Sequence, residues 1–225
     1  MIKAIIFDFD GTISNRKENA YGVFNEYLRQ FFKDFNEIEY EAVLQDLITY
    51  DCNGTISVKL RLIPFINKYG KYLPEDFEEK FIPFYYDHMY RFSVLKDETR
   101  SVLEKLKGEY KLAILSNGDS TSQHSKITQV NIEDFFDEVV VTGDIGVHKP
   151  NKEAFEYVLN KLNVKNDECL MIGDVFSSDI LGAINTNITP VWITLDDEIP
   201  AYHYDGYRIR HLDEIFEILE KENKK

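Results

Sequence analysis

Short apolar runs alternate with helix-like segments from about residue 94 onward, and this alternation is the feature that most constrains the fold. The runs predict strands over Leu112–Leu115, Glu138–Thr142, Cys169–Ile172 and Val191–Ile193. Apolar residues at helical spacing predict helices over 97–106, 152–162 and 179–185, and from about residue 213. Strands that alternate with helices form parallel sheets with right-handed crossovers. The sequence therefore predicts an α/β fold with a Rossmann-like open parallel sheet.

The first strand of this sheet is expected near the N-terminus, where the run Ala4–Phe7 is continuously apolar, as in a strand buried on both faces. The long segment that follows shows only helical periodicity, in four apolar stripes, and the third contains Pro64 as an expected kink or early end. These stripes are expected to form the core of a small bundle inserted after the first strand. We therefore predict two domains: an α/β core of residues 1–14 and 93–225, and an inserted helical domain of residues 15–92.

Polar and ionisable residues follow the predicted strands, where an open parallel sheet binds its ligands. Crowded carboxylates repel one another unless a cation lies between them, and oxygen ligands with retained water suit Mg²⁺. A carboxylate can attack phosphorus when a metal and hydrogen-bond donors neutralise the phosphoryl oxygens, and a second carboxylate can hold a proton for the leaving alkoxide. The set therefore indicates phosphoryl transfer. Its members are Asp8, Asp10, Ser116, Asn117, Lys149, Asp174 and Asp179.

Four ordered segments resemble the motifs of the haloacid dehalogenase-like (HAD) hydrolase superfamily: Asp8–Thr12, Leu115–Asn117, His148–Pro150 and Gly173–Asp179. The resemblance extends over nearly the whole chain. The helical insertion between the first and second motifs is similar to the first type of cap domain in that family. The resemblance therefore implies a cap that closes over the site, excludes water and selects the leaving group.

The same resemblance implies a role for each motif residue. Asp8 would be the nucleophile that becomes phosphorylated, and its carboxylate would also bind Mg²⁺. Asp10 would be the general acid and then the base for the hydrolytic water, with its backbone carbonyl on the metal. Ser116 and the Asn117 amide would bind the phosphoryl group, and Lys149 would neutralise charge between nucleophile and phosphate.

The fourth motif would complete the metal site. The resemblance implies that Asp174 is a side-chain ligand of the metal and that Asp179 binds it directly or supports a ligand. The alternative for Asp179 is that it caps the next helix. Asn15 and Arg16 follow the first motif and are candidates for substrate contacts, with a solvated connection as their alternative.

Asp10 favours a phosphatase, because the dehalogenases of this superfamily act on carbon and do not need the second aspartate of the first motif. We expect a Mg²⁺-dependent phosphatase that hydrolyses a small phosphomonoester, of nucleotide or sugar-phosphate type, through a phospho-aspartate. A phosphomutase, a haloacid dehalogenase and a non-catalytic metal-binding regulatory protein remain alternatives.

The charge of the chain bears on its partners. With 26 Lys and Arg against 40 Asp and Glu, the formal net charge is −14, which disfavours nucleic acid polymers and anionic membranes. The apolar N-terminal run ends at Asp8, short of a signal peptide or a membrane span. Cys52 and Cys169 are too few and too far apart for a disulfide framework. We therefore expect a cytoplasmic enzyme, as a monomer or homodimer.

Overall fold

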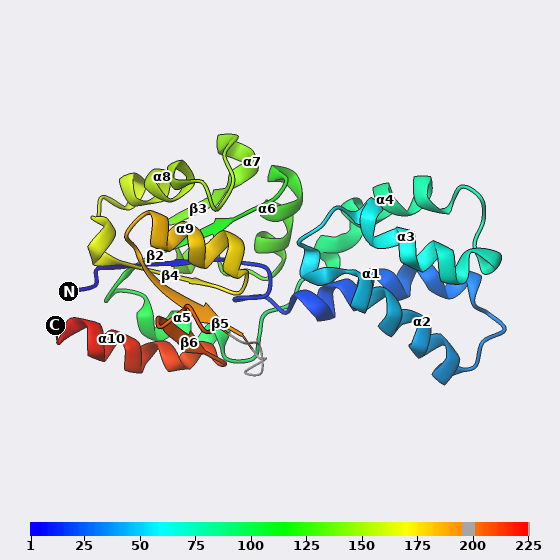
Figure 1. Ribbon diagram of the computed structural model, residues 1–225, viewed down its shortest axis with the longest axis horizontal. Coiled ribbons are helices and arrows are strands. Elements are labelled where there is room, and N and C mark those ends of the chain that lie inside the picture. The colour runs from blue at the N-terminus through cyan, green and yellow to red at the C-terminus, as the bar shows by residue number, and fades with distance from the viewer. Residues whose placement is uncertain (195–200, 225) are drawn as a thin grey trace. The chain divides into compact units, whose positions relative to one another are not determined.

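The computed structural model describes residues 1–194 and 201–224, and the chain divides into two compact units (Figure 1). The α/β unit comprises Met1–Ser14 and Leu95–Lys225, and the helical unit comprises Asn15–Val94. The chain leaves the α/β unit and returns to it at one place, because Ser14 and Leu95 pair as an antiparallel β-bridge.

Within the described residues, the α/β unit has one sheet of six parallel strands in the order β3-β2-β1-β4-β5-β6. The predicted α/β class with an open parallel sheet is therefore confirmed. Strand β1 lies between β2 and β4, so the strand order reverses there, which is where such sheets bind ligands. The strands are β1 (Ala4–Phe7), β2 (Lys111–Ser116), β3 (Glu138–Val141), β4 (Cys169–Gly173), β5 (Thr189–Ile193) and β6 (Tyr207–Ile209).

Helices cover both faces of this sheet (Figure 1). On one face α5 and α10 pack against the strands, and on the other face α8 and α9 do so. A π-helix, Phe176–Ile180, leads directly into α9. The helices of the unit are α5 (Thr99–Leu106), α6 (Ser120–Gln129), α7 (Thr142–Ile145), α8 (Lys152–Leu162), α9 (Leu181–Asn185) and α10 (Ile215–Asn223).

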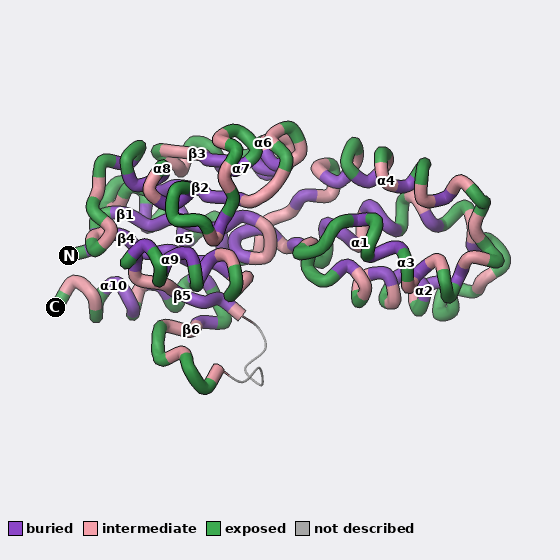
Figure 2. Tube along the Cα trace, turned by 45° about the horizontal axis from the view of Figure 1, so that its top comes forward, coloured by how far each residue is buried: buried purple, intermediate pink, exposed green. Residues whose placement is uncertain are grey.

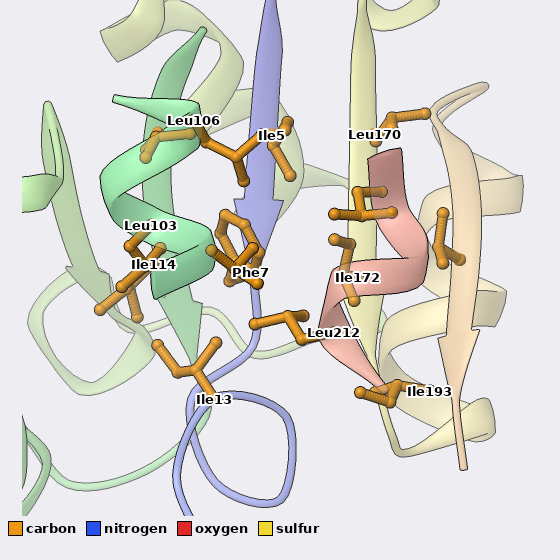
Figure 3. Close-up of a cluster of buried hydrophobic side chains, with 14 of the residues drawn as sticks. Ile5, Phe7, Ile13, Leu103, Leu106, Ile114, Leu170, Ile172, Ile193 and Leu212 are labelled. Carbon is orange, nitrogen blue, oxygen red and sulfur yellow. The ribbon is translucent and has the colours of Figure 1, made fainter. Parts of the chain in front are cut away.

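Strand β1 is buried on both faces, as its continuous apolar run predicts. Successive side chains of a strand point to opposite faces of the sheet. Ile5 and Phe7 accordingly belong to the core layer under α5 and α10, where Figure 3 shows them near Leu103 and Leu106 of α5. Ala4 and Ile6 belong to the opposite layer, and the tube of Figure 2 is buried along the central strands.

The helical unit has a separate apolar core, formed by the stripes that the sequence predicts. Aromatic rings fill much of it: the centroid of Phe81 lies 5.2 Å from that of Tyr27 and 5.4 Å from that of Phe77. The predicted early end at Pro64 is wrong, because the third helix continues past this residue to Tyr69. The helices are α1 (Arg16–Leu28), α2 (Glu37–Tyr50), α3 (Val58–Tyr69) and α4 (Phe77–His88).

Among the residues that the structure describes, no helix combines the length and the apolar character needed to cross a membrane.

Candidate active site

Three carboxylates meet at the carboxyl ends of β1 and β4. Asp8, Asp174 and Asp179 each offer one oxygen, and these oxygens all lie within 4.8 Å of one another. The backbone N–H of Asp8 donates to the carbonyl of Ile172, at 2.8 Å, which extends the pairing of β1 with β4 to the start of the site. The sheet therefore brings together the acidic residues of the first and fourth motifs, as the strand-end argument predicts.

Two glycines give these carboxylates the room to approach. Gly11 has φ +87°, and a Cβ atom at this position would lie 2.4 Å from Oδ2 of Asp174. A Cβ atom on Gly173 would lie 2.3 Å from the Cβ of Asp179. Any side chain at either position would displace a member of the acidic cluster.

One ammonium lies among these carboxylates. Nζ of Lys149 donates to Oδ1 of Asp8 at 2.6 Å and to the carbonyl of Leu115 at 2.7 Å, and it lies 2.8 Å from Oδ1 of Asp179. The lysine is buried, and burial opposes its charge, but the attraction of Asp179 and Asp8 raises the pKa of Lys149 above its ordinary value. The ammonium therefore stays charged and pairs with two of the three carboxylates.

Asn117 fixes the backbone on both sides of the Lys149 side chain. Its Oδ1 accepts from the N–H of Lys149 at 2.9 Å, and its Nδ2 donates to the carbonyl of Lys149 at 3.0 Å. The segment after β2 thus holds the segment after β3. Asn117 has a positioning function here in addition to the phosphoryl contact that the sequence predicts.

The electrostatic balance of the cluster suits a cation. Burial raises the pKa of Asp8 to about 7, with the charge of Asp179 adding to this effect and Lys149 opposing it. Burial, followed by the charges of Asp8 and Asp179, raises the pKa of Asp174 well above its ordinary value. Lys149 pairs with two of the three carboxylates, and the charge of Lys96 acts on Asp174, so carboxylates outnumber ammonium groups at this site. A divalent ion with oxygen ligands, as Mg²⁺ requires, fits this donor set.

Asp10 lies outside this cluster and contacts α6 instead. Its Oδ2 accepts from Nε2 of Gln123 at 2.9 Å and from Nζ of Lys126 at 2.5 Å. The same Nε2 lies 2.8 Å from Oγ of Ser116 and 2.9 Å from the carbonyl of Asn117. One amide therefore connects the predicted acid–base residue to the predicted phosphoryl-binding hydroxyl.

The sequence reasoning missed Gln123 and Lys126, because only the structure shows which face of α6 is buried. The buried positions of α6 and its C-cap are 123, 126, 127 and 130, which are spaced as one face of a helix. An amphipathic helix normally carries apolar residues at such positions, and buried lysine without a partner is rare. Two polar residues on this face indicate a polar target on the sheet.

Asn15 and Arg16 lie in the helical unit. The Asn15 side chain accepts from the backbone N–H of Glu18 and so caps α1. Nη2 of Arg16 lies 2.9 Å from Oδ2 of Asp51 and donates to Oη of Tyr85 at 2.8 Å. The structure thus gives both residues contacts within the helical unit, and the predicted substrate contacts stay predictions.

Asp51 is shared by two buried guanidinium groups. Nη1 of Arg61 donates to Oδ1 of Asp51 at 2.7 Å, opposite the contact from Arg16. Arg61 also donates to the carbonyls of Gly54 and Ile56, at 3.0 and 2.7 Å. Arg16 thus joins the segment between α2 and α3 to α1, and Arg61 joins the same segment to α3.

Comparisons with known proteins agree on the family. A family model described as haloacid dehalogenase-like hydrolase matches residues 5–193. The glyceraldehyde 3-phosphate phosphatase of Pyrococcus furiosus is 26% identical over 242 residues, which cover 99% of this chain and 95% of that protein. The pyrimidine 5'-nucleotidase YjjG of Escherichia coli is 37% identical over 94 residues, which cover 41% of this chain and 42% of that protein.

The fold is also similar to that of a solved structure. The crystal structure of the HAD-hydrolase YfnB from Bacillus subtilis, bound to magnesium, matches with a TM-score of 0.76 at 24% identity. The match covers 97% of this chain and 98% of that one, so the likeness of fold includes both units.

Proposed function

Because the chain belongs to the haloacid dehalogenase-like hydrolase family, we propose that it is a Mg²⁺-dependent phosphatase that hydrolyses a small phosphomonoester through a phospho-aspartate. One observation carries the proposal: Asp8 lies at the end of β1 with an ammonium on one oxygen and two further carboxylates close by. Asp10, two residues later, is held apart from these carboxylates by its contacts with Gln123 and Lys126 of α6.

In the first step, a carboxylate oxygen of Asp8 attacks phosphorus. The bond from that oxygen to phosphorus forms while the bond to the leaving oxygen breaks, and the electron pair departs with the leaving oxygen. Asp10 donates a proton to it, so that an alcohol leaves. Lys149, together with the Ser116 hydroxyl and the Asn117 backbone amide, stabilises the charge on the phosphoryl oxygens.

In the second step, water hydrolyses the acyl-phosphate. Asp10, now a carboxylate, accepts a proton from the water as its oxygen attacks phosphorus. The bond between phosphorus and the Asp8 oxygen breaks, and its electron pair restores the carboxylate. Inorganic phosphate leaves, and Asp10 has regained the proton that it gave to the alcohol.

Asp8, Asp174 and Asp179 would hold the Mg²⁺, with the backbone carbonyl of Asp10 as a further ligand. When bound, the ion supplies positive charge that offsets the negative charge of the carboxylates and of the phosphoryl group. The magnesium in the YfnB crystal supports this choice of ion.

The substrate is proposed to be a sugar phosphate or a nucleotide, in line with the activities for which the Pyrococcus and Escherichia relatives are named. The helical unit is proposed to be the cap that selects the leaving group, with Asn15 and Arg16 as candidate contacts. A nucleic acid polymer or a membrane is not expected as a partner, and the cytoplasm and a monomer or homodimer remain our predictions for location and assembly.

Phosphate release tests the function directly. The purified chain should release phosphate from 4-nitrophenyl phosphate with Mg²⁺, and a panel of phosphorylated metabolites should reveal its preferred ester. Asp8→Asn should abolish release, whereas Asp134→Asn, at an exposed position of the same unit, should leave it unchanged. Activity that survives EDTA or the Asp8 substitution would contradict the mechanism.

A further inference from the structure

We propose that Gln123 and Lys126 are positioning residues that fix the Asp10 carboxylate for proton exchange with the leaving group. We call this pair the α6 clamp. The inference rests on the proposed function, because it assigns a task to two residues around the proposed acid–base group.

The clamp is buried and makes convergent contacts. The side chain of Lys126 is 7% exposed and that of Asp10 is 19% exposed, and their ion pair joins positions 116 residues apart in the sequence. Gln123 adds a neutral donor to the same carboxylate oxygen. A single oxygen that receives an ammonium and an amide has a defined position relative to α6.

The turn before α6 is built to admit the Gln123 side chain. Gly118 has φ +148°, and a Cβ atom there would lie 2.8 Å from Cγ of Gln123. A Cβ atom on Gly143, at the start of α7, would lie 2.7 Å from the carbonyl oxygen of Gly118. The turn is therefore packed from both sides, and it directs Gln123 toward the end of the sheet.

Stability alone does not account for the clamp. A buried ion pair loses much of its attraction to the desolvation of both charges, and well-packed apolar residues in its place are often as stabilising or more so. An apolar residue at position 126 would extend the apolar face that Ile127 and Val130 form. The lysine instead directs its charge at Asp10, which points to a functional task.

The task follows from the distances that proton transfer requires. A general acid must lie within about 2.6–3.2 Å of the atom that receives its proton, and a displacement of about 1 Å can lower a rate ~10²-fold. Through Nε2 of Gln123, Asp10 is fixed relative to Ser116, which is proposed to bind the phosphoryl group. The clamp thus sets where the acid lies relative to the bond that breaks.

A pair of esters that differ in leaving-group basicity tests the clamp. Phenyl phosphate has the more basic leaving group and needs the proton, whereas 4-nitrophenyl phosphate has a similar shape and needs it much less. In the presence of Mg²⁺, Lys126→Met should lower kcat/KM for phenyl phosphate by ~10²-fold and for 4-nitrophenyl phosphate by less than about fivefold. The ratio kcat/KM is the measure to compare, because it reports phosphoryl transfer to Asp8 and leaves out the later hydrolysis that both esters share. Asp10→Asn should show the same selectivity.

Three further variants separate positioning from a general loss of structure. Lys126→Arg keeps the cation and should recover part of the lost kcat/KM for phenyl phosphate. Lys126→Met in an Asp10→Asn background should cause no further loss of kcat/KM for this ester, because both substitutions act on the transfer of the proton to its leaving group. Lys161→Met removes an exposed lysine from α8 and should leave the rate of phosphate release from both esters unchanged. If Lys126→Met does not fold by circular dichroism, Gln123→Leu should give the selective loss in its place.

The outcomes are distinct. If the wild-type chain releases no phosphate from either ester, the proposed phosphatase function fails and the clamp fails with it. If the wild-type chain is active and Asp10→Asn is selective, but the clamp variants slow both esters equally or neither, the clamp is refuted while the phosphatase stands. The clamp is also refuted if the losses caused by Lys126→Met and Asp10→Asn multiply in the variant that carries both substitutions.

Discussion

The ammonium of Lys149 lies 2.6 Å from the carboxylate of Asp8, although 141 positions separate the two residues in the sequence. The contact depends on the parallel sheet, because β1 pairs directly with β2 and β2 with β3. Each connection places its polar end at the same edge, so the connections after β1 and β3 contribute Asp8 and Lys149 to the charged cluster, and the connection after β4 contributes Asp174 and Asp179. Every prediction for the α/β unit depends on that arrangement.

Lys149→Met should lower the free energy of unfolding more at high pH than at low pH. The substitution leaves Asp8 and Asp179 without the ammonium they share, and removal of one partner from a buried pair costs about 3–5 kcal/mol. At pH 5.5 Asp8, whose pKa burial raises to about 7, is largely protonated and needs the cation less. Urea unfolding in EDTA at pH 8 and pH 5.5 measures the difference, and Lys161→Met serves as the exposed control. An equal loss at both pH values would contradict the charge argument.

The metal-free chain should lose stability as pH rises from about 4 to about 7. Burial raises the pKa of Asp8 to about 7, from an ordinary value of 3.8, so in this window the folded state binds more protons than the unfolded state. Raising the pH then favours unfolding through this group. The proposed Mg²⁺ would bind the ionised cluster, so the stabilisation that it gives to the fold should grow with pH.

The rise in Tm on adding Mg²⁺ measures this linkage. It should be larger at pH 8 than at pH 5.5, and Asp174→Asn should diminish it at both values. A rise in Tm that does not depend on pH would mean that the ion binds away from these carboxylates.

Gly11→Ala should weaken Mg²⁺ binding by ~10–100-fold, the range seen when the surroundings of metal ligands are disturbed. The new Cβ atom would lie 2.4 Å from Oδ2 of Asp174 and must displace that carboxylate. Gly108→Ala is a matched control, because its φ of +91° carries the same backbone strain with nothing within 4 Å of the new atom. Calorimetric titration of both variants with Mg²⁺ separates the clash from the strain, and equal affinities would show that the clash is harmless.

Asp51→Ala should destabilise the helical unit by about 3–5 kcal/mol, because it removes the carboxylate shared by the buried guanidinium groups of Arg16 and Arg61. The pair Lys80–Asp76 on α4 is exposed, and Asp76→Ala should cost no more than about 1 kcal/mol. Chemical unfolding of the two variants, followed by circular dichroism, makes the comparison. Similar losses would mean that the buried cluster adds nothing beyond a surface pair.

The sequence predicted those strands and helices of the α/β unit that carry a continuous apolar run or a clear helical spacing of apolar residues. Ala4–Phe7 is a strand with the predicted bounds, and Lys152–Leu162 is a helix with the predicted bounds. Strand β6, Tyr207–Ile209, was missed, because three residues at the edge of a sheet carry neither an apolar run nor a clear alternation. Pro64 was expected to end α3 as one alternative, yet the surrounding apolar contacts continue the helix past it.

The candidate site was predictable to the extent that it follows strand ends. Asp8, Asp174 and Asp179 lie together because parallel strands end at one edge, which a sequence pattern can express. The contacts of Asp10 with α6 were not predictable in this way, because they depend on which helical face turns toward the sheet. For Arg16 the sequence offered only its place after the first motif, and the distant Asp51 that it binds could not be inferred from that place.

The bridge between Ser14 and Leu95 has a consequence for how such chains vary. Two backbone hydrogen bonds flank it: the N–H of Asn15 donates to the carbonyl of Val94 at 2.9 Å, and the N–H of Lys96 donates to the carbonyl of Ile13 at 3.1 Å. The outgoing and returning segments therefore run side by side. Because the two ends of the inserted helical unit are adjacent, the insertion does not force the α/β unit to bridge a distance. A longer or shorter insertion at the same place would leave the strand order intact. The junction thus allows the helical unit to change in size without disturbing the strands that carry the charged cluster.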